Sequence, residues 1–214
     1  GMHNYTPGRY YHGVVDGDAT SVVAISVFED QVMGVIETAK DGNMIFGPVK
    51  GDEQGRYVLY RASDYTEELP FQCGSDKLTD QPKRTLPEII PNPESVNLTT
   101  NCVRAYLECD YDMFLEKGSV ANVVNHMTGL FNVVALLYSN DNMSTTVSEV
   151  FVWDSPDPYA TGSTVDALVS FRNYRTSYNG DIAHLVSRGA PTGGGVAWVD
   201  ALCSTYGYAY SYIY

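Results

Sequence analysis

The sequence predicts an α+β fold with three successive regions. Residues 1–68 contain short alternating apolar segments separated by Gly, Asp and Asn, a pattern typical of a β-meander. Residues 97–214 alternate strand-like and helix-like periods, which predicts a layered α/β domain with a mixed sheet and two long helices. Residues 69–96 lie between them and are rich in proline.

The first region is predicted to be β-rich throughout. Each of its segments combines β-branched or aromatic residues with flanking turn residues. The expected strands are Ser21–Phe28, Gln31–Glu37, Asn43–Val49 and Arg56–Tyr60.

The middle region is predicted to be a linker. Five of the ten prolines lie between Pro70 and Pro93, so this stretch cannot form a helix or a central strand. It also carries basic residues at Lys77, Lys83 and Arg84. An exposed segment of this kind is a site for proteolytic processing, although an ordered crossover without processing fits the same composition.

The third region carries its own start signals. Ser119 can cap a long helix whose apolar stripe runs from Val120 to Leu137 at spacings of three and four residues, and Ser163 to Asp166 resembles a capping box for a second helix. The first strand, Val103–Cys109, is expected to bury one side only. The further expected strands are Thr146–Trp153, Asp181–Val186, Val196–Val199 and the alternating tyrosines Tyr206–Tyr214.

Composition limits the possible partners. The chain has 214 residues, of which 44% are hydrophobic, enough to build a core. Its formal net charge of −13 disfavours binding to nucleic acid. No uninterrupted apolar run is long enough to predict a membrane span. The 17 tyrosines favour a secreted or cell-surface protein, although a β-rich composition gives the same bias.

Two stretches carry the functional signal. In Pro70-Phe71-Gln72-Cys73-Gly74-Ser75-Asp76, Pro and Gly bound a turn that presents one thiol. In Gly193-Gly194-Gly195-Val196-Ala197-Trp198-Val199-Asp200-Ala201-Leu202-Cys203, glycines precede a short apolar strand that ends near a cysteine. Together they resemble the reprolysin-like (adamalysin-type) zinc metallopeptidases of the metzincin clan.

The resemblance implies specific roles for these residues. Cys73 would be the thiol of the pro-segment that caps the catalytic zinc, as a cysteine switch. Gly194, Gly195, Val196, Ala197 and Trp198 would form the edge strand that binds a peptide or protein substrate. Without the resemblance, Cys73 is a small hydrophobe and the strand an ordinary sheet edge protected by its glycines.

The resemblance also implies metal ions. Zinc is expected in full-length family members, but none of the four histidines begins a His-Glu-x-x-His pair, so the zinc helix is missing from these residues. Glu108 and Asp181 resemble positions that hold a structural calcium in some reprolysins. An aspartate that opens a strand also serves to bind nearby backbone, which is the alternative for Asp181.

Two functions are compatible with these residues. The first is the N-terminal part of a secreted zinc-dependent metalloendopeptidase, with a pro-segment, which is inactive as given because the zinc motif is absent. The alternative is a catalytically dead extracellular peptide-binding or adhesion module on a metzincin-like scaffold. In either case an exposed apolar edge invites another strand, from a second molecule or from the chain itself.

We predict that residues 1–214 bind no stoichiometric zinc, because one thiol and scattered histidines cannot assemble a tetrahedral site. When the purified chain is incubated with zinc and the unbound metal is then removed, metal analysis should give far less than one zinc ion per chain. A tightly held equivalent of zinc would contradict this expectation.

Overall fold

A computed structural model describes residues 5–52, 54–66, 72–78, 102–191, 193–202 and 204–213. The chain contains strands and helices in two units. The meander unit comprises Gly1–Leu69 and Lys117–Asn142, and the sheet unit comprises Pro70–Glu116 and Met143–Tyr214. The predicted α+β class is confirmed. Residues 117–142 were expected to belong to the domain at 97–214, but their contacts place them in one unit with the N-terminal strands.

The meander unit contains a five-stranded antiparallel sheet. Its strands pair in chain order, so each strand contacts the one before it, as the turn spacing predicted. The strands are β1 (Arg9–Val15), β2 (Asp18–Val27), β3 (Val32–Thr38), β4 (Gly42–Pro48) and β5 (Tyr57–Arg61), followed by a single 3₁₀ turn, η1 (Ala62–Asp64).

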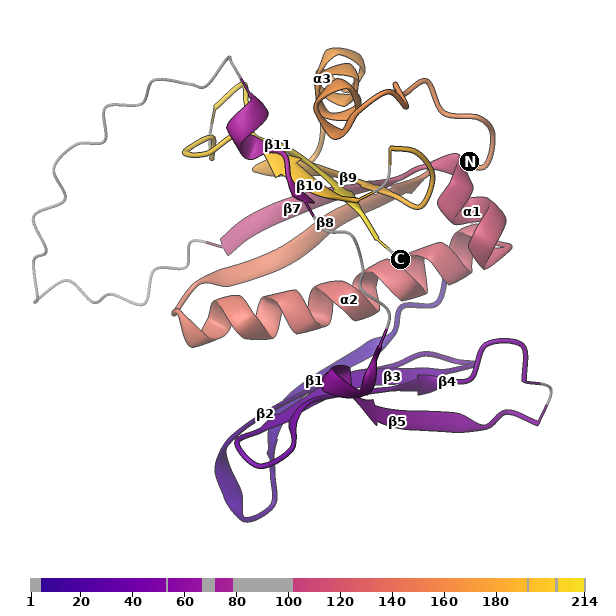
Figure 1. Ribbon diagram of the computed structural model, residues 1–214, viewed down its shortest axis with the longest axis vertical. Coiled ribbons are helices and arrows are strands. Elements are labelled where there is room, and N and C mark those ends of the chain that lie inside the picture. Colours follow the sequence, from indigo (N-terminus) through magenta and orange to yellow (C-terminus); the bar gives the residue numbers. More distant parts are fainter. Residues whose placement is uncertain are drawn as a thin grey trace, which may run out of the picture. The chain divides into compact units, whose positions relative to one another are not determined.

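One long helix, α2 (Val120–Asn140), packs against β1, β2 and β3 of this sheet (Figure 1). The Ser119 hydroxyl accepts a hydrogen bond from the Asn122 amide at 3.1 Å, so the predicted cap is present. Gly129 allows close approach to the sheet, because a Cβ there would lie 2.4 Å from the sulfur of Met33.

The predicted apolar stripe of α2 is only partly correct. Leu137 at its C-terminal end is exposed, whereas the polar Asn132 is buried. The Asn132 amide donates to the Ile25 carbonyl oxygen at 3.2 Å and to the Ser26 hydroxyl at 3.1 Å. Nε2 of His12 hydrogen-bonds to the main-chain carbonyl oxygen of Asn132 at 3.0 Å. Buried hydrogen bonding, which periodicity does not report, therefore joins this helix to β2.

Helix α2 also bears on the expectation that no segment could span a membrane. By length and composition alone it is apolar enough to cross one, because its interruptions are uncharged polar residues. One such helix is a weak indication, since core helices of soluble proteins share these properties. Its contacts with the sheet are those of a packed helix.

The sheet unit contains a mixed six-stranded sheet in the order β6-β10-β11-β9-β7-β8. Strands β8, β7, β9 and β11 run parallel, and β10 is antiparallel to β11. The strands are β6 (Gln72–Cys73), β7 (Cys102–Cys109), β8 (Ser144–Val152), β9 (Ile182–Ser187), β10 (Gly194–Ala197) and β11 (Tyr208–Tyr212). Strand β10 thus lies near one border of the sheet and β7 inside it.

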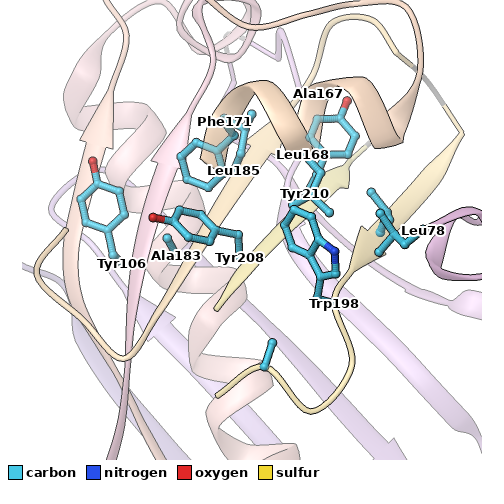
Figure 2. Close-up of a cluster of buried hydrophobic side chains, with 12 residues drawn as sticks. Leu78, Tyr106, Ala167, Leu168, Phe171, Ala183, Leu185, Trp198, Tyr208 and Tyr210 are labelled. Atoms are coloured by element: carbon cyan, nitrogen blue, oxygen red, sulfur yellow. The ribbon is translucent and has the colours of Figure 1, made fainter. Parts of the chain in front are cut away.

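Helix α3 (Thr164–Tyr174) covers one face of this sheet and contacts β10 and β11 (Figure 1). The Ser163 hydroxyl accepts from the Asp166 amide at 3.1 Å, as the capping pattern predicted. Leu168 and Phe171 of α3 pack with Leu185 and Tyr208 in the buried cluster drawn in Figure 2.

One expectation for this unit is wrong. Strand β7 was expected to bury one side, but both sides are buried from Ala105 to Cys109, because Tyr106 joins the buried cluster and Glu108 binds Arg175. A short helix, α1 (Tyr111–Lys117), follows this strand. Asp110 caps it by accepting from the Met113 amide at 2.9 Å.

We predict that Asn132→Leu lowers the free energy of unfolding by about 1–3 kcal/mol, because the Ser26 hydroxyl and the Ile25 carbonyl lose a buried partner. Urea denaturation would measure the loss. The matched control is Asn140→Leu at the exposed end of the same helix, expected within about 0.5 kcal/mol of the parent. Equal losses in both variants would contradict a role for the buried amide.

Candidate functional site

Strand β10 presents a main-chain edge rather than a row of side chains. Gly193 and Gly194, with φ of 93° and 137°, make the turn into the strand in a conformation that other residues rarely adopt. Val196 pairs with Tyr210 of β11, and its side chain is 3% exposed. The N–H and C=O groups of Gly195 and Ala197 therefore point to the other side.

The chain covers this outer edge with its own residues 72–78, hereafter the covering segment. Strand β6 runs parallel to β10, with Gln72 beside Gly194 and Cys73 beside Gly195. The Gly74 amide donates to the Gly195 carbonyl oxygen at 2.8 Å. The Ser75 hydroxyl donates to the Ala197 carbonyl oxygen at 3.1 Å and accepts from its amide at 3.4 Å. The expected exposed edge is thus filled within the chain.

Two residues of the covering segment, Gly74 and Leu78, pack closely against the rest of the sheet unit. A Cβ at Gly74 would lie 2.9 Å from the Thr164 hydroxyl and 3.1 Å from Cβ of Val196, so the backbone approaches these residues closely. After the 3₁₀ turn η2 (Ser75–Lys77), Leu78 is 8% exposed and belongs to the buried cluster. The segment is therefore held by backbone pairing, close packing and one apolar anchor.

The thiol of Cys73 is exposed at this edge. Its pKa is lowered, first by a hydrogen bond from the Ser75 amide and second by one from the Ser75 hydroxyl, whose single proton serves either the thiolate or the Ala197 carbonyl oxygen. The negative charge of Asp76 acts in the opposite direction. These hydrogen bonds favour the thiolate, the form of cysteine that attacks electrophiles and binds metals.

A cleft of about 400 Å³ lies beside the covering segment. One wall is formed by the segment itself and the others by the N-terminus of α3 and the loop before β10. Its lining residues are Gly74, Lys77, Thr161, Gly162, Ser163, Thr164, Ala190, Pro191 and Gly193.

Asp110 positions the loop before β10, a role that the sequence analysis missed. Its carboxylate accepts from the Ser187 hydroxyl at 2.5 Å and from the amides of Arg188 and Gly189 at 3.1 and 3.2 Å. Burial raises its pKa, although these hydrogen bonds oppose the shift. An Asp three residues before Met113, directly after a strand, is the capping signal that identifies it.

The structure does not bring Glu108 and Asp181 together as a calcium site. The Asp181 carboxylate accepts a hydrogen bond from the main-chain amide of Arg104 at 2.8 Å. Arg104 lies four residues before Glu108 on β7, and at about 3.3 Å per residue this places Arg104 about 13 Å from Glu108 along the strand. Asp181 therefore binds nearby backbone, the alternative noted from its position.

Glu108 is instead part of a buried ion pair. It is 0% exposed and binds Arg175 through Nε at 2.7 Å. The hydroxyl of Tyr106 and the indole of Trp153 donate to it at 2.7 Å, and the hydroxyl of Tyr159 also donates. With its oxygen atoms paired in this way, the carboxylate holds Arg175, the residue that follows α3.

The histidines of the described residues do not form a metal site. His184 lies in β9 and bonds the Ser211 hydroxyl at 2.9 Å, and burial lowers its pKa to about 4, so it stays neutral. Among the described residues, no three His, Cys, Asp or Glu side chains are grouped to hold a metal. Cys73, Cys102 and Cys109 are free thiols, and Cys203 lies outside the described residues.

Trp198 differs from its expected role. Strand β10 ends at Ala197, and the indole of Trp198 is 6% exposed, packed edge-on against Tyr206 at 5.3 Å between ring centroids. Arg172 of α3 lies over the same pair of rings. Trp198 thus supports the strand end from the core instead of forming part of the open edge.

We predict that Ser75→Ala raises the pKa of the Cys73 thiol, because the thiolate loses the hydroxyl donor. Asp76→Asn should lower that pKa further, because a repelling charge is removed. The pH profile of iodoacetamide alkylation at Cys73, followed by peptide mapping, would show midpoints that move in opposite directions. Two midpoints that move together would contradict this account.

Comparison with known proteins identifies the family. Residues 99–212, more than half of the chain, match a reprolysin family described as Metallo-peptidase family M12. Among solved structures, metalloproteinase-II from Bacteroides fragilis is similar at 13% identity and a TM-score of 0.48, over 89% of this chain and 63% of that one. A chain from a chaperone-substrate complex is similar at 13% identity and a TM-score of 0.42, over 89% and 24%. The chain spans less than two thirds of the length of either protein. On the sequence match, the chain belongs to metallo-peptidase family M12.

Proposed function

We propose that this chain is the latent, N-terminal part of a secreted zinc-dependent endopeptidase in which β10 holds an extended peptide substrate. The observation that carries the proposal is the pairing of Gly195 and Ala197 with the covering segment. A peptide that adds a strand to β10 would use the same amides and carbonyls. The covering segment and a substrate therefore compete for one edge.

The orientation of the edge fits a role in positioning. Gly195 and Ala197 face outward through backbone atoms, so β10 can hold peptides of many sequences in one extended geometry. Asp110 and the buried core fix this edge before a peptide arrives. Preorganised positioning of this kind lowers the entropic cost of bringing a scissile bond to a catalytic group.

Zinc dependence is proposed from the family. The described residues group no three side chains suited to a zinc site, so they do not fit the metal by themselves. Cys73 is the proposed capping thiol, supported by its exposure and its lowered pKa. Secretion is proposed from the family and the tyrosine-rich composition.

We predict that Gly74→Val uncovers β10, because the added side chain meets Thr164 and Val196 within about 3 Å. Amide exchange at Ala197, whose N–H now contacts Ser75, should rise at least about tenfold. Binding of fluorescent casein peptides should rise in parallel. The matched control is Gly47→Val in the meander unit, where a Cβ meets nothing within 4 Å.

Three outcomes bear on the proposal. Unchanged exchange at Ala197 in the Gly74→Val variant would show that the segment does not depend on this close packing. Faster exchange without peptide binding would remove the substrate-strand role. Peptide binding by the full-length protein with zinc, without hydrolysis, would favour the alternative of a non-catalytic peptide-binding or adhesion module.

A further inference from the structure

Strand β5 (Tyr57–Arg61) is a border strand of the meander sheet, and in the described part of the chain it pairs with β4 alone (Figure 1). All five of its residues are exposed, although four of them are large and apolar or aromatic. Natural edge strands are usually protected by lysine, proline or a bulge. The opposite border strand, β1, has a register shift between Gly13 and Val15. Strand β5 contains no lysine or proline, and its register with β4 is regular.

The hydrogen bonding of the sheet shows which main-chain groups of β5 point outward. The Val49 amide donates to the Arg56 carbonyl oxygen at 2.9 Å, so Arg56 faces β4. In an antiparallel ladder, successive residues direct their N–H and C=O groups to alternate sides. The main-chain groups of Tyr57, Leu59 and Arg61 therefore point away from β4, toward the open border.

The side chains at both ends of β5 are held over the sheet instead of beyond its border. The Tyr57 ring stacks on Phe46 at 5.2 Å between centroids, and its hydroxyl accepts from the Val32 amide at 3.1 Å. Arg61 donates to the Asp41 carboxylate at 2.8 Å. These contacts leave the outward N–H and C=O groups of the strand accessible to another strand.

The strand is complementary to a second copy of itself. With Leu59 on a twofold axis, an antiparallel partner strand places Leu59 opposite its own equivalent and Tyr57 opposite Arg61, so outward groups meet outward groups. Val58 then lies opposite Tyr60, a β-branched and aromatic pair that favours sheet formation. Charge does not oppose this approach, because β5 has no acidic residue in a chain whose net charge is −13.

We propose that β5 joins two copies of this chain into a symmetric dimer, through antiparallel pairing of Tyr57–Arg61 centred on Leu59. The interface is isologous, because the same strand contributes from both copies. The two meander sheets then form one continuous sheet, and each copy protects the open border of the other. The dimer does not depend on the proposed function, because β5 belongs to the meander unit and β10 to the sheet unit.

Sedimentation velocity of the full 214-residue chain, over an about hundredfold range of concentration, tests the dimer. The parent chain should shift from one copy to two as concentration rises. Leu59→Lys places two like charges opposite each other and should raise the dimer Kd by at least about tenfold. Leu59→Pro should act similarly, because it removes an N–H that makes no bond to β4. The matched control is Val14→Lys, at an exposed valine of β1, which should leave the dimer unchanged.

A crosslink tests the register. Leu59→Cys, in a Cys73→Ser background, should form a disulfide between two copies under oxidised glutathione, because directly opposite residues of a hydrogen-bonded pair have Cα atoms about 5.5 Å apart. Val14→Cys in the same background is the control and should crosslink far more slowly. Peptide mapping identifies the bonded residues.

A parent chain that stays monomeric at every concentration would overturn the proposal. A dimer that persists in both Leu59 variants would also overturn it, as would a dimer lost only in Val14→Lys, which would place the contact on β1. Thermal unfolding of each variant verifies that a lost dimer does not reflect a lost fold.

Discussion

The open edge of β10 is the constraint on which the arrangement of the sheet unit depends. A sheet border leaves N–H and C=O groups without partners, and natural proteins cover or interrupt such borders. Here the covering segment pairs Gly195 and Ala197 and places Leu78 in the core. One surface thus combines backbone pairing with burial of an apolar side chain. Under the proposed function, protection of the edge and recognition of a peptide use the same backbone groups.

Two buried carboxylates at the end of β7 hold the elements around this edge. Asp110 binds the amides of Arg188 and Gly189, in the loop that leads to β10. Glu108 binds Arg175 directly after α3, the helix whose first residue, Thr164, meets Gly74. Removal of one partner of a buried charge costs far more than loss of a surface ion pair. The position of the edge is therefore set by electrostatics several residues away from it.

Local signals predicted much of this fold, and tertiary partners decided the rest. The caps at Ser119 and Ser163 form as predicted, because a cap depends on residues within one turn. The two-sided burial of β7 depends on the buried cluster and on Arg175, which lie against it, and the burial of Asn132 depends on β2. The pairing of Glu108 with Arg175 joins residues 67 positions apart, which periodicity does not encode. Partners that are so distant in the sequence can be identified only in the three-dimensional structure.

The small size of β6 makes tethering the main reason why the covering segment stays in place. Two ladder positions, the contacts of Ser75 and one leucine make a modest contact surface. Within one chain, a tethered segment competes at an effective concentration in the millimolar range, which turns weak binding into nearly full occupancy. A cut after the covering segment removes one of its two tethers, while the other runs through the N-terminal strands, which stay packed on α2. Under the proposed function, cleavage near the basic residues Lys83 and Arg84 therefore lowers the occupancy of the edge, and full release also requires the N-terminal strands to leave α2.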